Sequence, residues 1–223
     1  MKEQCLMSNY FEYVASIMPQ LLLGLKVTLQ MTVVSLALAV VVGMASCMFS
    51  ISKVKPLNWI SGVYLSIIRG TPLMVQSFFI YFGLTAALDF RISIFKAAVI
   101  VLCLNAGAYL SEIFRSGIAA VNKGQMEAAR SLGLPYGVAM RKVILPQAIR
   151  IVIPSVLNQF IITLKDTSIL SAIGCMELMK QSMMIVSRNF RSFETYAVIA
   201  VMYYVVVMVL TKIFKIIERR LSN

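Results

Sequence analysis

The sequence predicts an all-α integral membrane protein with about five transmembrane helices. Sixty per cent of its 223 residues are hydrophobic and 13% are charged, whereas about 25% of the residues of a soluble domain are charged. The apolar residues gather in stretches long enough to cross a bilayer, which takes roughly 20 mostly apolar residues per helix. The excess of 21 Lys and Arg over 9 Asp and Glu fits the basic loops of membrane proteins better than a nucleic-acid surface.

Five ranges of the chain are expected to span the membrane. The first lies within 21–49, because no residue from Val27 to Ser52 is charged. The second, 57–88, would be about 50 Å long as one straight helix, against a hydrocarbon core of about 30 Å. Gly70, Thr71 and Pro72 lie in its middle, so we expect a kink or break there. The other ranges are 97–114, 151–176 and 195–211.

The basic residues of the connecting segments favour an N-terminus outside and a C-terminus in the cytoplasm. With that orientation the inner segments hold twelve basic residues and the outer segments hold six. The inner ones are Lys53, Lys55, Arg115, Lys123, Arg130, Arg141, Lys142, Arg150, Lys212, Lys215, Arg219 and Arg220. Cytoplasmic loops carry the excess of Lys and Arg, and an odd number of spans agrees with ends on opposite sides.

Several classes of chemistry are unsupported by the sequence. There is no histidine, which removes the usual general base and the commonest metal ligand. Cys5, Cys47, Cys103 and Cys175 are scattered without metal-ligand spacing. No G-x-x-x-x-G-K-[ST] segment is present, so nucleotide phosphates cannot be held in the P-loop manner. We expect a single permease domain over 1–223, no catalytic residues, no metal, no cofactor on this chain and no cleaved signal peptide.

The segment 115–150 between the third and fourth spans is too long for a simple turn. Residues from Glu127 onward favour a helix that ends near Gly133, with Pro135 shortly after it. A second helical stretch is expected to run to Leu145 and stop at Pro146. Spacing alone also allows an interfacial amphipathic helix that lies on lipid headgroups.

The residues of this segment resemble the EAA loop of the permease subunits of bacterial ABC importers. Glu127, Ala128 and Ala129 match the loop's opening, Gly133 follows at the family spacing, and Leu145 and Pro146 close it. Val143 stands where the family has isoleucine. Further stretches resemble the polar amino-acid permeases (the His/Gln/Arg/cystine type). They are Ile68–Leu73, Val75–Gln76, Phe78–Tyr81, Ala108–Tyr109, Glu112–Arg115 and Leu164–Ser168.

The resemblance implies a type I ABC importer permease fold and a loop that acts as a coupling helix. In that family the loop docks on a separate ATP-binding subunit, present in two copies, which binds ATP and Mg. The ATPase-coupling residues would be Glu127, Ala128, Ala129, Gly133, Leu134, Leu145 and Pro146. The alternative for the alanines is packing against the ends of their own spans. The resemblance also implies a second permease subunit, identical or related, and an extracytoplasmic solute-binding protein.

Polar residues inside the spans are candidates for the substrate pathway, because intramembrane charges are costly and usually face a cavity or a partner. They are Arg69, Thr71, Gln76, Asn105, Lys165, Asp166 and Thr167. Arg69 could meet a substrate carboxylate, or form a structural ion pair beside the break. Asp166 could bind a substrate amino group, and Asn105 could instead form an interhelical hydrogen bond.

The expected function is therefore a multi-pass permease subunit of an ATP-driven importer of polar amino acids in a bacterial inner membrane. It would form the pathway as a dimer and work by alternating access. The alternative is a secondary transporter driven by an ion gradient, which is usually longer and built from internal repeats. An intramembrane enzyme lacks a plausible nucleophile–base pair. Nothing in the sequence selects one amino acid.

Overall fold

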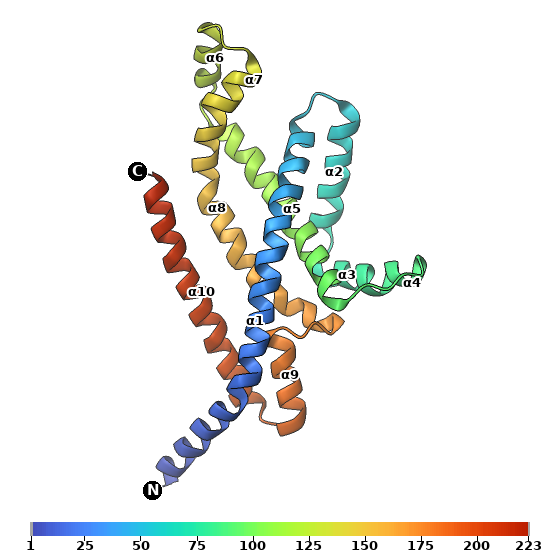
Figure 1. Cartoon of the computed structure of the whole chain (residues 1–223), viewed down its shortest axis with the longest axis vertical. Helices are drawn as coiled ribbons and strands as arrows, with labels where there is room; N and C mark the ends of the chain where they lie inside the picture. The colour runs from blue at the N-terminus through green and yellow to red at the C-terminus, as the bar shows by residue number, and fades with distance from the viewer. Residues whose placement is uncertain (1, 223) are drawn as a thin grey trace.

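A computed structural model describes the backbone of residues 2–222 and the side chains of residues 10–220. All regular secondary structure in the described chain is helical, without a β-strand (Figure 1). In chain order its segments are α1 (Lys2–Ile51), α2 (Lys55–Gly70), α3 (Leu73–Phe78), η1 (Phe79–Leu84), α4 (Thr85–Ala87), α5 (Ile94–Ala120), α6 (Lys123–Ser131), α7 (Tyr136–Ala139), η2 (Met140–Ile144), α8 (Leu145–Asp166), η3 (Thr167–Ile173), α9 (Leu178–Asn189) and α10 (Ser192–Ser222). Cys5 lies outside the described side chains.

Four described helical stretches are long and apolar enough to cross a membrane: Tyr10–Ile51, Ile94–Ala120, Tyr136–Ile173 and Ser192–Arg220. A fifth candidate is the broken pair Lys55–Gly70 and Leu73–Ala87, whose two halves are bent by 108°. The protein is therefore an all-α membrane protein with four to five candidate spans, as the composition predicted.

The break in the second span lies at Thr71 and Pro72, between α2 and α3. Thr71 is extended (φ −122°, ψ 144°) and Pro72 caps α3 (φ −64°, ψ 141°). Proline disfavours helical backbone in the residue before it and cannot donate a helical hydrogen bond. The Thr71–Pro72 pair therefore accounts for the turn that sends α3 and α4 away from α2 in Figure 1.

Helix α1 packs along α5 at the centre of the molecule. Gly43 makes the close approach possible, because a Cβ there would lie 2.8 Å from the Leu110 Cβ and 2.9 Å from the Gly107 carbonyl oxygen. Leu36, Ala39, Ala106 and Leu110 form the buried apolar contact beside it.

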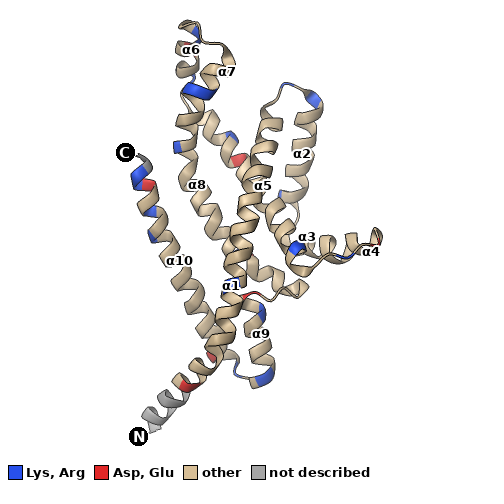
Figure 2. Cartoon of the chain, viewed as in Figure 1, with Lys and Arg blue, Asp and Glu red and all other residues tan. Residues whose placement is uncertain are grey.

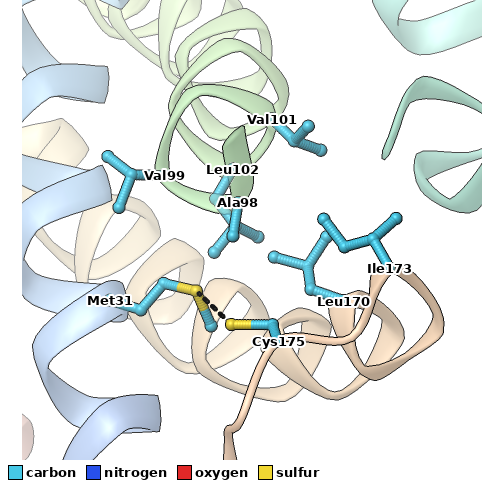
Figure 3. Packing of buried hydrophobic residues seen from close by; sticks show 8 residues of the cluster. All are labelled: Met31, Ala98, Val99, Val101, Leu102, Leu170, Ile173 and Cys175. Carbon is cyan, nitrogen blue, oxygen red and sulfur yellow. Dashed lines mark hydrogen bonds between the residues drawn. The ribbon is translucent and has the colours of Figure 1, made fainter. Parts of the chain in front are cut away.

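A second buried cluster joins α1 and α5 to the chain that follows α8. Figure 3 shows Met31 of α1 facing Ala98 and Leu102 of α5, with Leu170, Ile173 and Cys175 closing the cluster. The Cys175 Sγ lies 3.8 Å from the Met31 Sδ. The contact fixes the end of the third long stretch against the first two.

One expectation about the loop is wrong, because Pro146 does not stop the helix before it. Segments α7, η2 and α8 follow one another without a break from Tyr136 to Asp166. The turn η2 is π-helical, and such a turn locally changes the hydrogen-bond pattern that a proline would otherwise interrupt. Pro146 lies in the first two positions of α8, where its missing N–H costs little. The Gln147 Nε2 donates to the Val143 carbonyl oxygen at 2.9 Å.

The segments that charge assigns to the cytoplasm lie at one end of the molecule. Figure 1 places the α1–α2 connection, the α6–α7 region and the C-terminus toward the same end, and α9 at the opposite end. Figure 2 shows Lys and Arg at the end with the α1–α2 connection and around α9, and further charged residues between them around α3, α4 and α5. This arrangement agrees with the grouping of segments used in the charge comparison.

Candidate functional site

The loop between α5 and α8 is built as two short helices around a glycine turn. The Asn122 side chain caps α6 by accepting a hydrogen bond from the Gly124 N–H at 2.8 Å. At the other end Gly133 is left-handed (φ +83°). Its N–H donates to the Arg130 carbonyl, and the Leu134 N–H donates to the Ala129 carbonyl. These two bonds form a Schellman motif, which needs a residue that tolerates positive φ.

The residues of the EAA pattern are divided between an inner and an outer side of α6. Ala129 is 4% exposed, whereas Glu127 and Ala128 are exposed. Leu132 is 83% exposed and Tyr136 is 59% exposed. The loop thus presents an acidic, a small and two large apolar or aromatic side chains to its surroundings, and such exposed apolar side chains mark contact surfaces.

The inner side of the loop is packed on the ends of α5 and α8. Val121, Ile144 and Ala148 are buried together, with Met126 and Met140 against them. Leu134 and Leu145 are half-buried, and Pro146 is exposed. A displacement of α6 therefore acts on α5 and α8 through this apolar contact.

A hydrogen-bonded network surrounds the break in the second span and contains three of the pathway candidates. The Gln76 Nε2 donates to the Ile68 carbonyl at 2.7 Å, and to the Thr71 carbonyl and hydroxyl oxygens at 3.0 Å each. The Asn105 Nδ2 donates to the Gln76 Oε1 at 3.4 Å. Gln76 and Asn105 are both 8% exposed. The network satisfies carbonyls that the break frees and links α2, α3 and α5.

Arg69 forms an ion pair instead of standing alone. Its Nη1 lies 3.5 Å from the Glu112 Oε2, and its guanidinium carbon lies 5.9 Å from the centre of the Tyr109 ring. Glu112 also accepts two hydrogen bonds from Arg115, at 2.8 and 3.2 Å. The side chains of Arg69 and Arg115 are about half exposed. The cluster carries one net positive charge on an open face of α2 and α5.

Lys165, Asp166 and Thr167 lie where α8 changes into η3. Lys165 is exposed, Asp166 is half-buried and Thr167 is buried, with its hydroxyl donating to the Leu164 carbonyl at 2.7 Å. Among the described residues neither Lys165 nor Asp166 has an ion-pair partner within 4 Å. No hydrogen bond or ion pair within the described chain joins this group to the Gln76 network.

A fully buried carboxylate, Glu177, was not predicted from the sequence. Its two oxygens accept the N–H groups of Met179 and Lys180 at 2.8 and 2.7 Å, which caps α9. The Tyr203 hydroxyl of α10 donates to it at 3.1 Å. Burial raises the pKa of the Glu177 carboxyl, and these hydrogen bonds act against that rise. Its place just beyond a span, in a short apolar–polar segment, gave no signal of burial.

Comparisons with known proteins identify the family. Residues 35–223 match the family described as "Binding-protein-dependent transport system inner membrane component". The chain belongs to this family. It is accordingly a multi-pass membrane component of a transport system, and the family is not catalytic in itself. Among the described residues no group of three His, Cys, Asp or Glu could hold a metal ion.

Individual relatives cover almost the whole chain. The arginine transport system permease protein ArtQ of Bacillus subtilis is 40% identical over 205 residues, covering 92% of this chain and 94% of that protein. The glutamine transport system permease protein GlnP of Escherichia coli K12 is also 40% identical, over the same shares.

Solved structures agree in fold. The crystal structure titled as an amino acid ABC transporter with histidines contains a chain that is 40% identical to this one, with a TM-score of 0.90. The match covers 94% of this chain and 98% of that one. An inward-facing MetNI methionine ABC transporter has a TM-score of 0.78 at 19% identity, covering 93% of this chain and 99% of that one, which supports the fold alone. The chain therefore has the type I ABC importer permease fold, as the EAA loop implied.

Proposed function

We propose that this chain is the permease subunit of an ATP-driven importer of polar amino acids in a bacterial inner membrane. Relatives named as arginine and glutamine permeases at 40% identity support the substrate class. The excess of basic residues in the inner segments, twelve against six in the outer segments, supports an outer N-terminus and a cytoplasmic C-terminus.

The exposed surface of α6 is the observation that supports coupling of this chain to an ATPase. A separate ATP-binding subunit, in two copies that bind ATP and Mg, would seat on Glu127, Ala128 and Leu132. Ala129, Gly133 and Leu134 shape the helix and its turn. Leu145 and Pro146 continue it into α8. Closure of the ATPase would then displace α5 and α8 through their buried contact with the loop.

The pathway needs a second permease subunit, identical or related, because five helices are few to enclose an aqueous route. The half-exposed Arg69 would bind a substrate carboxylate through the guanidinium N–H groups that Glu112 does not occupy. Asp166 would meet the ammonium group, with Lys165 and Thr167 beside it. Thr71, Gln76 and Asn105 would hold the broken helix that borders the route. An extracytoplasmic solute-binding protein would deliver the substrate, and alternating access would carry it inward.

The deciding experiment is co-purification of the tagged chain in mild detergent, followed by mass spectrometry and ATP-dependent uptake in liposomes. We expect a stoichiometric P-loop ATPase that is lost in Glu127→Lys. Gln125→Lys is the matched control, because Gln125 is exposed on the opposite face of α6. Uptake driven by an ion gradient without ATP or a second protein would overturn the proposal in favour of a secondary transporter.

A second arm tests the pathway residues. Asp166→Asn should weaken uptake while ATPase co-purification stays unchanged. Unchanged uptake kinetics in this variant would remove Asp166 from the substrate pathway and leave the coupling assignment intact.

A further inference from the structure

Helix α8 carries an exposed polar side chain, Asn158, in the middle of a membrane-spanning stretch. Residues 151–164 hold no charge, and Asn158 lies at their centre, about 12 Å along the helix from Arg150. Its side-chain amide is exposed and forms no hydrogen bond with any residue that the structure describes. An amide that faces lipid without a hydrogen-bond partner is costly. Water, a polar solute or another subunit must therefore meet this side chain within the membrane.

Asn158 of α8 and Glu112 of α5 both point away from α1, the helix that packs on α5 and α8. A Cβ on Gly107 of α5 would lie 3.1 Å from the Val42 Cγ1 of α1, and Glu112, five residues after Gly107, is turned from it by about 140°. On α8, Val156 packs against the buried cluster between α1 and α5, and Asn158 is turned from Val156 by about 200°. The two polar side chains therefore share the side of the molecule opposite α1.

The same two side chains lie at about the same depth in the membrane. Successive spans run in opposite directions, and α5 and α8 touch closely, because a Cβ on Gly117 would collide with the Val152 side chain. Asn158 lies six residues after Val152, and Glu112 lies five residues before Gly117. Each step leads toward the α9 end of the molecule, by about 9 Å and about 8 Å respectively. Asn158 is thus level with Glu112.

Charged side chains on this side show that it is not a lipid-facing surface. The Arg69 Nη1 lies 3.5 Å from the Glu112 Oε2, and the two side chains are 46% and 26% exposed. Intramembrane charges face a partner or a water-filled cavity. Lys165, also exposed, follows Asn158 by seven residues and so lies on the same face of α8 two turns away. The open side of α5 and α8 therefore carries polar groups at two depths.

We propose that Asn158 lines the solute route and hydrogen-bonds the solute as it passes the Arg69–Glu112 pair. The inference rests on the proposed function, in which the Arg69 guanidinium binds the carboxylate of a polar amino acid. The Asn158 Oδ1 would accept a hydrogen bond from the solute ammonium group, and its Nδ2 would donate to a polar side chain of the solute. Asp166 lies eight residues further along α8, about 12 Å away along the axis. Asn158 therefore serves a position of the solute inward of Asp166.

The test labels cysteine variants of the complete transporter in nanodiscs with a cationic, water-soluble methanethiosulfonate, and mass spectrometry reads the label at each position. Asn158→Cys should react about tenfold faster than Val41→Cys, because the reactive thiolate is scarce in apolar surroundings. Val41 is the control, because it is 67% exposed on α1 and lies two residues before Gly43, which packs on α5. Saturating L-glutamine or L-arginine should slow the reaction at position 158 and leave position 41 unchanged.

Uptake by the complete transporter in liposomes is the second readout. Asn158→Leu should raise the KM for the amino acid about tenfold, the effect of losing one hydrogen bond to a charged group. Co-purification of the ATPase should stay unchanged in this variant. Asn158→Gln keeps the amide and should recover most of the affinity, which a merely structural role would not predict.

Three results would overturn the inference. Reaction at position 158 as slow as at position 41 would mean that the side chain faces lipid. A disulfide that joins position 158 in two copies of the Asn158→Cys variant would make it a contact between permease subunits. Labelling that neither amino acid slows, with an unchanged KM in Asn158→Leu, would remove it from the route. Labelling needs neither ATP nor uptake, so its outcome is separate from a failure of the proposed function, which would show as uptake driven by an ion gradient.

Discussion

Glu177 shows how a single buried carboxylate can hold three elements together. It caps α9 through two backbone N–H groups and receives the Tyr203 hydroxyl from α10. The neighbouring Leu178 N–H donates to the Thr28 Oγ1 of α1 at 3.1 Å. The junction therefore fixes α9 to the first and last long helices.

Glu177→Gln should destabilise the folded protein by about 1–3 kcal/mol, because an amide replaces one acceptor oxygen with a donor that faces a backbone N–H. Thermal unfolding in detergent measures the change. Glu194→Gln should cost much less, since Glu194 forms a partly exposed pair with Arg191, which lies just before α10. Equal losses in both variants would contradict the role given to Glu177.

Gln76 gives a second prediction at this scale. Gln76→Leu should cost about 1–3 kcal/mol, since the Ile68 and Thr71 carbonyls lose their donor at the break. Unfolding of the purified protein is the measurement, and Gln125→Leu on the exposed α6 is the control. A variant as stable as the wild type would mean that the break does not depend on this network.

Breaks and turns could be predicted where the residue type alone restricts the backbone. Pro72 after Gly70 indicated the break, and Gly133 before Pro135 indicated the turn. The burial of Glu177 and the Arg69–Glu112 pair could not be predicted, because both depend on helices far apart in the sequence. The same limit applies to Ala128 and Ala129, whose different exposures follow from the packing of α6 on its neighbours.

At the scale of elements, the loop depends on one left-handed residue. Gly133→Ala should cost about 1–2 kcal/mol of loop stability, since a Cβ is strained at positive φ. Co-purification of the ATPase and ATP-dependent uptake should fall together.

Gly137→Ala is the matched control for that prediction. Gly137 lies in α7 without positive φ, and nothing lies within 4 Å of an added Cβ. The control should keep full coupling or gain about 0.5–1 kcal/mol. A coupling loss of the same size in Gly137→Ala would show that the loop tolerates no side chain there, and the φ argument would fail.

Helix boundaries around the loop were harder to predict than the loop itself. Pro146 is a helix breaker by propensity, yet the π-helical turn η2 carries the helix past it. The packing of Ile144 and Ala148 against Val121 favours the continuous helix, and this tertiary contact is invisible in a local pattern. The short helix α9 was not predicted either.

For the whole molecule, stability depends on how closely α1 approaches α5. Gly43→Ala should destabilise the protein by about 1–3 kcal/mol through overpacking against Leu110 and the Gly107 carbonyl. Gly62→Ala on α2 has open space around it and should be neutral or slightly stabilising. The midpoint of thermal unfolding distinguishes them, and the reverse order of the two variants would contradict the packing described.

The unbroken path from Tyr136 to Asp166 makes the loop and α8 a lever arm. A rigid, straight helix of this length would measure about 45 Å, and a tilt of roughly 10° at its loop end would move its far end by about 8 Å; Pro154, inside α8, is where such a rod can bend. The far end carries Asp166 and Thr167. Had Pro146 ended the helix, the same tilt would be absorbed at a flexible joint. A small rotation at the loop can thus become a displacement large enough to open or shut a route for a small solute.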